Sequence, residues 1–166
     1  DSVKSRGLGD VYKRQAYSSD EAKITIVGLP DRPGIAAAVF GQLADHLVNV
    51  DMIVQSASST TKTTDISFSV GRLDIEKAVD IIKKSKESLE FETIAADPNI
   101  SKISIVGTAM RSQPGVAKTM FESLAAKGVN IQVISTSEIK ISVLIDAEYT
   151  ELAVRSLHTA FGLDDA

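Results

Sequence analysis

GIAAAVFGQLADHLVNVDMI, residues 34–53, is followed 81 residues later by the related stretch GVAKTMFESLAAKGVNIQVI, residues 115–134. The two stretches align without a gap. Chance rarely produces matches in both spacing and residue type over such a length, so the sequence predicts an internal duplication. The identical positions are Gly34, Ala36, Phe40, Leu43, Ala44, Val48, Asn49 and Ile53, which recur as Gly115, Ala117, Phe121, Leu124, Ala125, Val129, Asn130 and Ile134.

Each copy opens with an alternating β-branched segment that ends at a glycine, ITIVG at 24–28 and ISIVG at 103–107, which predicts a strand. Apolar residues then recur with helical spacing, at Ile35–Leu43 and Val116–Leu124. Two strands and a second helix follow in each copy. Copy one adds a last strand, Phe91–Ala95, whereas copy two reaches Leu163 without one. The expected strands are 50–56 and 66–70, then 131–136 and 139–145; the second helices lie around 75–82 and 152–161.

The order βαββαβ is that of a ferredoxin-like sandwich. We therefore predict an α+β protein with two tandem units, each an antiparallel sheet covered by two helices. The expected limits are 16–97 for the first unit and 98–166 for the second, with the boundary at Asp97-Pro98-Asn99. The strand missing from copy two could come from Ala16–Ser19 or from native sequence preceding it.

Residues 1–15, DSVKSRGLGDVYKRQ, differ from the rest of the chain. They show neither helical nor strand periodicity, and they lack the apolar core of a secretion signal. They resemble the unrelated prefixes found at the ends of translated sequence fragments. We expect a non-native or disordered prefix; a flexible basic arm is the alternative.

Composition narrows the possible functions. The 166 residues carry a net charge of −4, 43% are hydrophobic, and there is no cysteine. Disulfides, thiolate metal sites and cysteine nucleophiles are therefore excluded. The acidic balance and the scarcity of aromatic residues disfavour a nucleic-acid partner, and no apolar run is long enough to span a bilayer. A soluble, cytoplasmic protein is expected.

No catalytic constellation is apparent in the sequence. The two histidines, His46 and His158, fall on different predicted helices without the spacing of metal ligands, and no carboxylate pair is spaced for acid–base chemistry. Phosphate-binding glycine motifs are absent as well. We therefore expect no catalytic residues, no metal and no cofactor in this chain.

The loop before the first helix offers binding chemistry instead. Pro33 restricts the backbone and Gly34 permits close approach, while the free N–H groups of a helix starting near Ile35 would attract a carboxylate. Asp31 could pair with an ammonium group, so the loop could receive a free α-amino acid. The alternative is that Asp31 merely caps the helix and Pro-Gly merely turns the chain, which is common. Gln55 and Ser58, near the end of the next strand, are further candidates.

The residues resemble a known family. A glycine-ended strand, Asp31-Arg32-Pro33-Gly34, an Ala-rich helix and VNVDMIVQ at 48–55 resemble the ACT domain, a regulatory module that binds small molecules. Two copies, with TTDISF at 63–68 and NIQVISTSEIKISVL at 130–144, closely resemble the C-terminal regulatory region, or separate β subunit, of bacterial aspartate kinase. The resemblance covers about residues 20–163, and Ser135–Leu144 is its most specific segment.

The resemblance implies an allosteric sensor of the effectors L-threonine, L-lysine or both, working by feedback inhibition. It implies a homodimer through ACT–ACT pairing and association with a kinase catalytic domain or subunit, whose Lys-x-Gly-Gly start is absent here, so the chain alone should not phosphorylate aspartate. In copy two, Gln113 replaces the acidic loop residue, which weakens a second site there. The effector residues carried over are Asp31, Pro33, Gly34, Ile35, Ala36, Asp51, Gln55, Ser58, Asn130, Ile131, Ser135, Ser137 and Glu138, with Thr64 and Ser67 in support.

Three other functions are compatible with parts of this pattern. A stand-alone tandem ACT protein could regulate another enzyme. A ferredoxin-like nucleic-acid binder would need exposed aromatic residues and a basic stripe, which Phe68 alone does not provide. A small hydrolase of the same fold would need a paired Arg/Asn catalytic loop, which we do not find.

Overall fold

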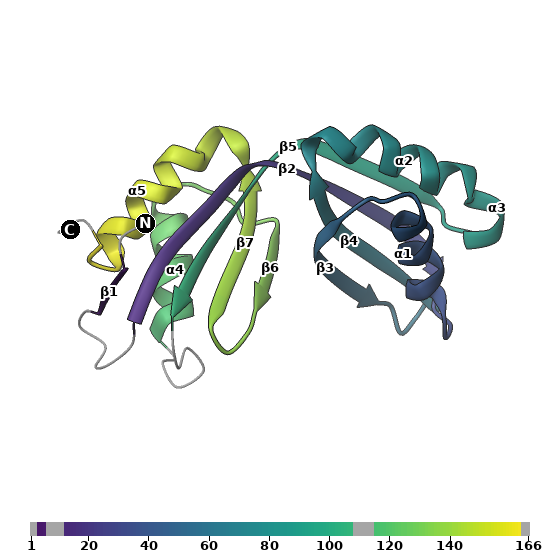
Figure 1. Ribbon diagram of the computed structural model, residues 1–166. Helices are drawn as coiled ribbons and strands as arrows, with labels where there is room; N and C mark the ends of the chain where they lie inside the picture. Colours follow the sequence, from purple (N-terminus) through teal and green to yellow (C-terminus); the bar gives the residue numbers. More distant parts are fainter. Residues whose placement is uncertain (1–2, 6–11, 108–114, 164–166) are drawn as a thin grey trace. The chain divides into compact units, whose positions relative to one another are not determined.

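The computed structural model describes residues 3–5, 12–107 and 115–163. From β2 onward, each repeat has the predicted order of a strand, a helix, two strands and a second helix (Figure 1). Short 3-10 turns, Arg72–Asp74 and Ala147–Tyr149, precede the second helix of each repeat. The elements are β1 (Val3–Ser5), β2 (Tyr12–Pro30), α1 (Ile35–Asp45), β3 (Val50–Ala57), β4 (Thr63–Gly71), α2 (Ile75–Lys84), α3 (Lys86–Leu89), β5 (Thr93–Gly107), α4 (Gly115–Ala126), β6 (Val133–Thr136), β7 (Lys140–Asp146) and α5 (Thr150–Ala160).

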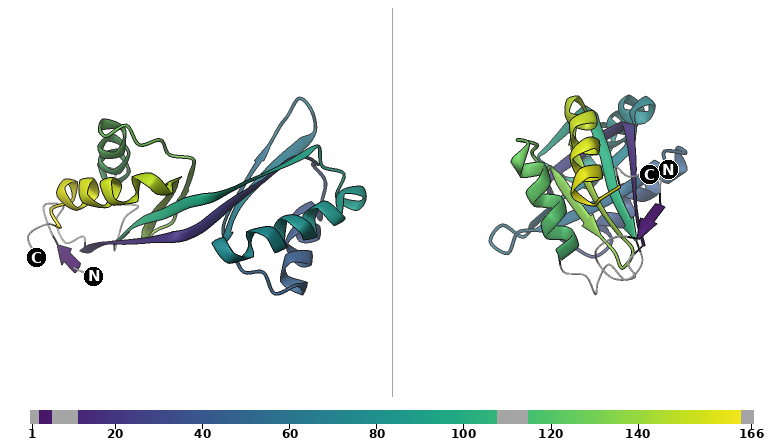
Figure 2. Two further views of the ribbon diagram at one scale, coloured as in Figure 1. Left: turned by 90° about the horizontal axis from the view of Figure 1, so that it is seen from above. Right: turned by 90° about the vertical axis from the view of Figure 1, so that its left-hand side faces the viewer.

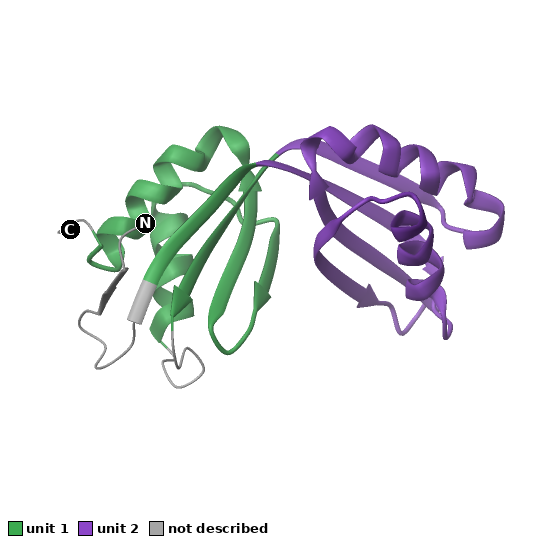
Figure 3. Ribbon diagram, in the orientation of Figure 1, with its two compact units in different colours: residues 1–19, 100–166 green, residues 20–99 purple. Residues whose placement is uncertain are grey.

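Tertiary contacts divide the chain into two compact units, each an α+β ferredoxin-like unit (Figure 3). Unit 2 is Asp20–Asn99, and unit 1 combines Asp1–Ser19 with Ile100–Ala166. Both β2 and β5 therefore contribute one part to each unit. The predicted limits, 16–97 and 98–166, differ from this division in the boundary and in residues 16–19, which the sequence also offered as the missing strand of the second unit.

Unit 2 has its strands in the order β3-β4-β2-β5, with β4 antiparallel to both β3 and β2. Alternate residues of β2 and β4 point toward α1 and α2, which lie on one face of these strands (Figure 2). Phe68 on β4 is 1% exposed and meets the Phe40 ring of α1 edge to face at 5.3 Å. This apolar face is why the helical and strand periodicities of copy one could be read from its sequence.

Unit 1 repeats this arrangement, with β7 between β5 and β6 and antiparallel to both. Helices α4 and α5 lie together on one face of its strands (Figure 2). Their buried residues, among them Met120, Leu124 and Leu157, form a core with the alternate residues of β5 and β7. The duplication predicted from the sequence is therefore also a duplication of packing.

The boundary between the repeats differs from the prediction. Asp97-Pro98-Asn99 was expected to separate two strands, but β5 continues from Thr93 to Gly107. The fixed φ of proline is compatible with a strand, but proline has no backbone N–H to donate. It can therefore lie in a strand at a position where no hydrogen bond to a neighbouring strand is needed. The Pro98 carbonyl accepts a hydrogen bond from Arg72 Nε at 2.7 Å, and pairing with β7 begins only at Ile100.

The N-terminal segment contributes strands where the sequence showed no periodicity. Val3–Ser5 forms β1 and pairs antiparallel with Tyr12–Arg14 of β2. β2 is the neighbour of β5 in the sheet, and the residues of β2 up to Ser19 belong to unit 1. Ala16–Ser19, which the sequence offered as the missing strand of copy two, thus lies in a strand of unit 1. Within the described ranges, no helix is long and apolar enough to cross a membrane.

Candidate functional site

The loop between β2 and α1 is held in place from two sides. The Asp31 N–H donates to the Lys62 carbonyl oxygen at 3.1 Å, which ties the loop to the β3–β4 turn. Arg32 Nη1 donates to Glu90 Oε2 at 3.2 Å, just after α3. Both side chains of this ion pair are about half exposed, so its main effect is to orient the loop rather than to stabilise the fold.

The N-terminus of α1 is open. Gly34 has φ 90° and ψ −5°, a left-handed conformation that favours glycine, and no side chain caps the helix. The Ile35 N–H reaches the Arg32 carbonyl at 3.3 Å, and among the described residues the next two N–H groups, of Ala36 and Ala37, have no acceptor. The alternative that Asp31 caps this helix is therefore wrong. The free N–H groups and the helix dipole leave a place suited to an anion beside the exposed Asp31.

Two predicted residues, Gln55 on β3 and Ser58 just after it, lie at the same end of unit 2 as this loop. Pro30 pairs with Thr63 of β4, and Ala57 of β3 pairs with Thr64, so the ends of the three strands come together. Gln55 is exposed and pairs with Ile66, a residue of the helix-covered face. Ser58 is half-buried, and its hydroxyl is engaged with Thr60 and the Thr61 N–H inside the turn. The exposed side-chain amide of Gln55 is therefore more available to a ligand than the Ser58 hydroxyl.

Asp51 is exposed but lies at the other end of β3. It precedes Ser58 by seven residues, roughly 23 Å along a strand at about 3.3 Å per residue. Unit 2 does not bring it to the loop. The resemblance implied that Asp51 lines the strand side of the site together with Gln55 and Ser58, but the length of β3 places Asp51 at the opposite end of the strand from Ser58.

Thr64 and Ser67 act within the sheet. Thr64 is 1% exposed, and its hydroxyl donates to the Ser56 carbonyl oxygen at 3.2 Å. The Ser67 and Thr25 hydroxyls lie 3.0 Å apart, across β4 and β2. Both hydroxyl groups are therefore hydrogen-bonded within the strands that carry the site.

The predicted residues of unit 1 fall near the two ends of the edge strand β6. Asn130 and Ile131 precede β6, exposed and half-buried respectively, while the exposed Ser135, Ser137 and Glu138 lie at and beyond its end. The Ser137 N–H donates to the Lys140 carbonyl oxygen at 2.7 Å, closing the β6–β7 turn. The second Pro-Gly loop, with Gln113, lies outside the described residues.

Two groups that position the loop are not apparent from the sequence. Glu90 pairs with Arg32 over 58 positions of sequence, and the Lys62 carbonyl accepts from Asp31. A single sequence indicates neither contact, because the Arg32–Glu90 pair depends on tertiary packing and the Asp31–Lys62 hydrogen bond involves only backbone atoms. Among the described residues, no group of three or more His, Asp or Glu side chains could hold a metal ion.

Comparison with known proteins agrees with this architecture. The family model described as "ACT domain" matches residues 24–85 and 103–161, one match for each repeat. The chain is 51% identical over 149 residues to an aspartokinase of Pseudomonas aeruginosa, a match that covers 90% of this chain and 36% of that protein. The chain thus spans about a third of the length of the aspartate kinases that it matches.

Solved structures give the same result for the fold. A structure of aspartokinase alpha and beta subunits superposes with a TM-score of 0.83 at 45% identity, covering 89% of this chain and 97% of that one. The regulatory subunit of aspartate kinase from Thermus thermophilus superposes with a TM-score of 0.82 at 39% identity, covering 89% and 96%.

Two repeated ferredoxin-like units, each matched by the family model, define a tandem ACT module, and the chain belongs to the ACT-domain family. More particularly, its pair of units corresponds to the regulatory region of aspartate kinase.

Proposed function

We propose that this chain binds L-threonine, L-lysine or both and transmits the binding to an aspartate kinase catalytic part as feedback inhibition. The observation that carries the proposal is the uncapped N-terminus of α1 beside the exposed Asp31. The free N–H groups match an α-carboxylate, and the Asp31 carboxylate matches an α-ammonium group. Gln55 supplies an amide at the same end of the unit.

The proposed mechanism is a population shift. An effector that binds one arrangement of the paired regulatory units better than another favours the kinase state linked to that arrangement, by the difference in affinity. In this proposal Asn130, Ile131, Ser135, Ser137 and Glu138 face the loop from the second unit of a partner chain. A cytoplasmic location accords with this role and stays a prediction.

Calorimetric titration of the chain with L-threonine and L-lysine, separately and each in the presence of the other, tests the proposal. We expect saturable binding of at least one. Asp31→Asn should weaken it about tenfold, because a charge-assisted hydrogen bond contributes about 1.5–3 kcal/mol. Asp45→Asn removes the same charge at the opposite end of α1 and should leave the affinity unchanged.

Binding of neither amino acid by a folded chain would reject the proposed effectors and favour the stand-alone regulator of another enzyme. Equal loss in Asp31→Asn and Asp45→Asn would mean that net charge, and not the loop, determines affinity. Replacing Gly34 or Ser58 by a bulky residue is expected to abolish the effector response without unfolding the chain. A Cβ on Gly34 would meet no atom within 4 Å, but its φ of 90° strains any side chain there, so Gly34 variants should lose about 1–2 kcal/mol of folding free energy.

A further inference from the structure

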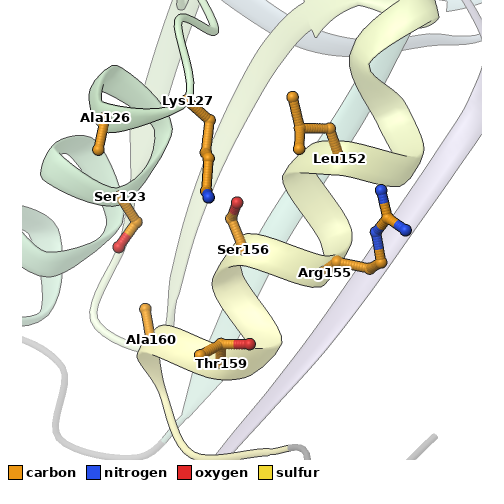
Figure 4. Close-up of a pocket in the computed structure, with 8 residues that line it drawn as sticks. All are labelled: Ser123, Ala126, Lys127, Leu152, Arg155, Ser156, Thr159 and Ala160. Atoms are coloured by element: carbon orange, nitrogen blue, oxygen red, sulfur yellow. The ribbon is translucent and has the colours of Figure 1, made fainter.

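A groove between α4 and α5 of unit 1 lies outside the loop and strand residues discussed above (Figure 4). It has a volume of about 450 Å³. The α4 side contributes Ser123, Ala126 and Lys127. The α5 side contributes Leu152, Arg155, Ser156, Thr159 and Ala160.

The internal repeat explains why this groove exists. In unit 2 the equivalent seam between α1 and α2 is closed by a hydrogen bond from the Ser85 hydroxyl to the Gln42 side chain and by the buried Ile81. Aligning Leu43 with Leu124 and Ile82 with Leu157 places Ser123 at Gln42, Ala160 at Ser85 and Ser156 at Ile81. All three residues of unit 1 are the smaller ones, so its helices leave an open space.

Two hydrogen-bond donors of this groove, the Ser156 hydroxyl and the Lys127 ammonium group, could bind a ligand that carries a hydrogen-bond acceptor. Ser156 Oγ is buried and has no hydrogen-bond partner among the described residues. A buried hydroxyl without a hydrogen-bond partner is unfavourable, and a ligand oxygen that accepts from it would offset that penalty. Figure 4 shows the Lys127 side chain extending from the end of α4 toward Ser156 on α5.

Charge distinguishes the groove from its counterpart. None of the eight lining residues is acidic, and Lys127 and Arg155 are cationic. The Arg155 guanidinium lies 3.7 Å from Glu151 in an exposed pair, whereas no ion pair involves Lys127 within the described residues. The equivalent positions of unit 2 hold His46 and Asp80, with Asp45 at the place of Ala126. Only the groove of unit 1 therefore favours an anion.

We propose that the α4–α5 groove binds a small organic oxyanion, a carboxylate or phosphate with a short apolar portion. The oxyanion accepts hydrogen bonds from Ser156 Oγ and the Lys127 ammonium group. The apolar portion lies against Leu152 and Ala160. This second site is independent of the amino-acid site proposed for the α1 loop.

Chemical-shift titration of the ¹⁵N-labelled chain with butyrate, monobutyl phosphate and inorganic phosphate tests the proposal. At least one organic anion should give saturable shifts of the α4 and α5 amides. Lys127→Gln should weaken binding about tenfold, by loss of a charge-assisted hydrogen bond. Ser156→Ile restores the residue type found at position 81 and should abolish binding by filling the groove. Lys118→Gln, an exposed lysine on another face of α4, should leave it unchanged.

Thermal denaturation of each variant establishes that it is folded, and Ser156→Ala, which removes the hydroxyl without filling the space, should weaken binding without changing the fold. Absence of saturable shifts in the groove with all three probes overturns the proposal. So does binding that survives Ser156→Ile, or groove shifts that occur only when the kinase catalytic part is added, since the groove would then be a protein contact. Loss of threonine or lysine binding, with groove binding intact, would contradict only the proposed function.

Discussion

Leu47 and Gly128 occupy the same position of the repeat, directly after the first helix of each copy. Both have positive φ, 61° and 72°, in the left-handed region. In each copy the following valine N–H reaches back to the helix, from Val48 to the Leu43 carbonyl and from Val129 to the Leu124 carbonyl. This C-terminal turn favours glycine, and Leu47 adopts it although its side chain is 84% exposed.

We expect Leu47→Gly to raise the free energy of unfolding by up to about 1 kcal/mol, because it removes the Cβ strain of the left-handed conformation and loses little packing. Gly128→Leu should lower it by about 1 kcal/mol for the opposite reason. Chemical denaturation of both variants measures these changes. Destabilisation by Leu47→Gly of more than about 1 kcal/mol would show that the Leu47 side chain makes contacts important for stability.

At the scale of the elements, the repeat also preserves a pair of hydroxyl groups between neighbouring strands. Ser104 of β5 lies opposite Ser142 of β7, with the hydroxyl oxygens 2.7 Å apart and both residues buried. The corresponding pair in unit 2 is Thr25 and Ser67. Each hydroxyl of unit 1 depends on the other for its hydrogen bond, because water does not reach them.

Ser142→Ala should therefore destabilise the chain by about 1–3 kcal/mol by leaving the Ser104 hydroxyl buried without this partner. The double variant Ser104→Ala/Ser142→Ala should recover part of that loss, since no orphaned hydroxyl remains. A double-mutant cycle from denaturation curves measures the coupling energy. Additive losses would mean that the two hydroxyls do not depend on each other.

At the scale of the whole molecule, the outermost strands of the two units carry the same exposed residue. β3 and β6 are at the ends of the strand order, and Ile53 and Ile134, equivalent in the repeat, are 50% and 45% exposed. Exposed apolar side chains on unpaired edge strands favour association with another chain. They support the proposed homodimer through ACT–ACT pairing.

Ile53→Lys combined with Ile134→Lys should shift the chain from dimer toward monomer by at least about tenfold in dissociation constant, because each lysine would place a charge on the pairing edge. Sedimentation velocity over a range of protein concentrations measures this. The control is Leu73→Lys, which changes an exposed leucine outside β3 and β6. A wild-type chain that is monomeric at all concentrations would contradict the pairing.

The sequence by itself determined the duplication, the type and order of the repeated elements, and the candidate loop. These are local or periodic properties: the apolar face of Ile35–Leu43, the alternation in 24–28 and the Pro-Gly turn are all visible within one segment. Tertiary structure alone decided that β5 continues through Pro98. It also decided that Ala16–Ser19, one of the two sources considered for the missing strand of copy two, belongs with Ile100–Ala166. It also decided the Arg32–Glu90 ion pair, the separation of Asp51 from the loop and the groove beside Ser156. Each depends on contacts between residues far apart in the chain, whose distances no local pattern encodes.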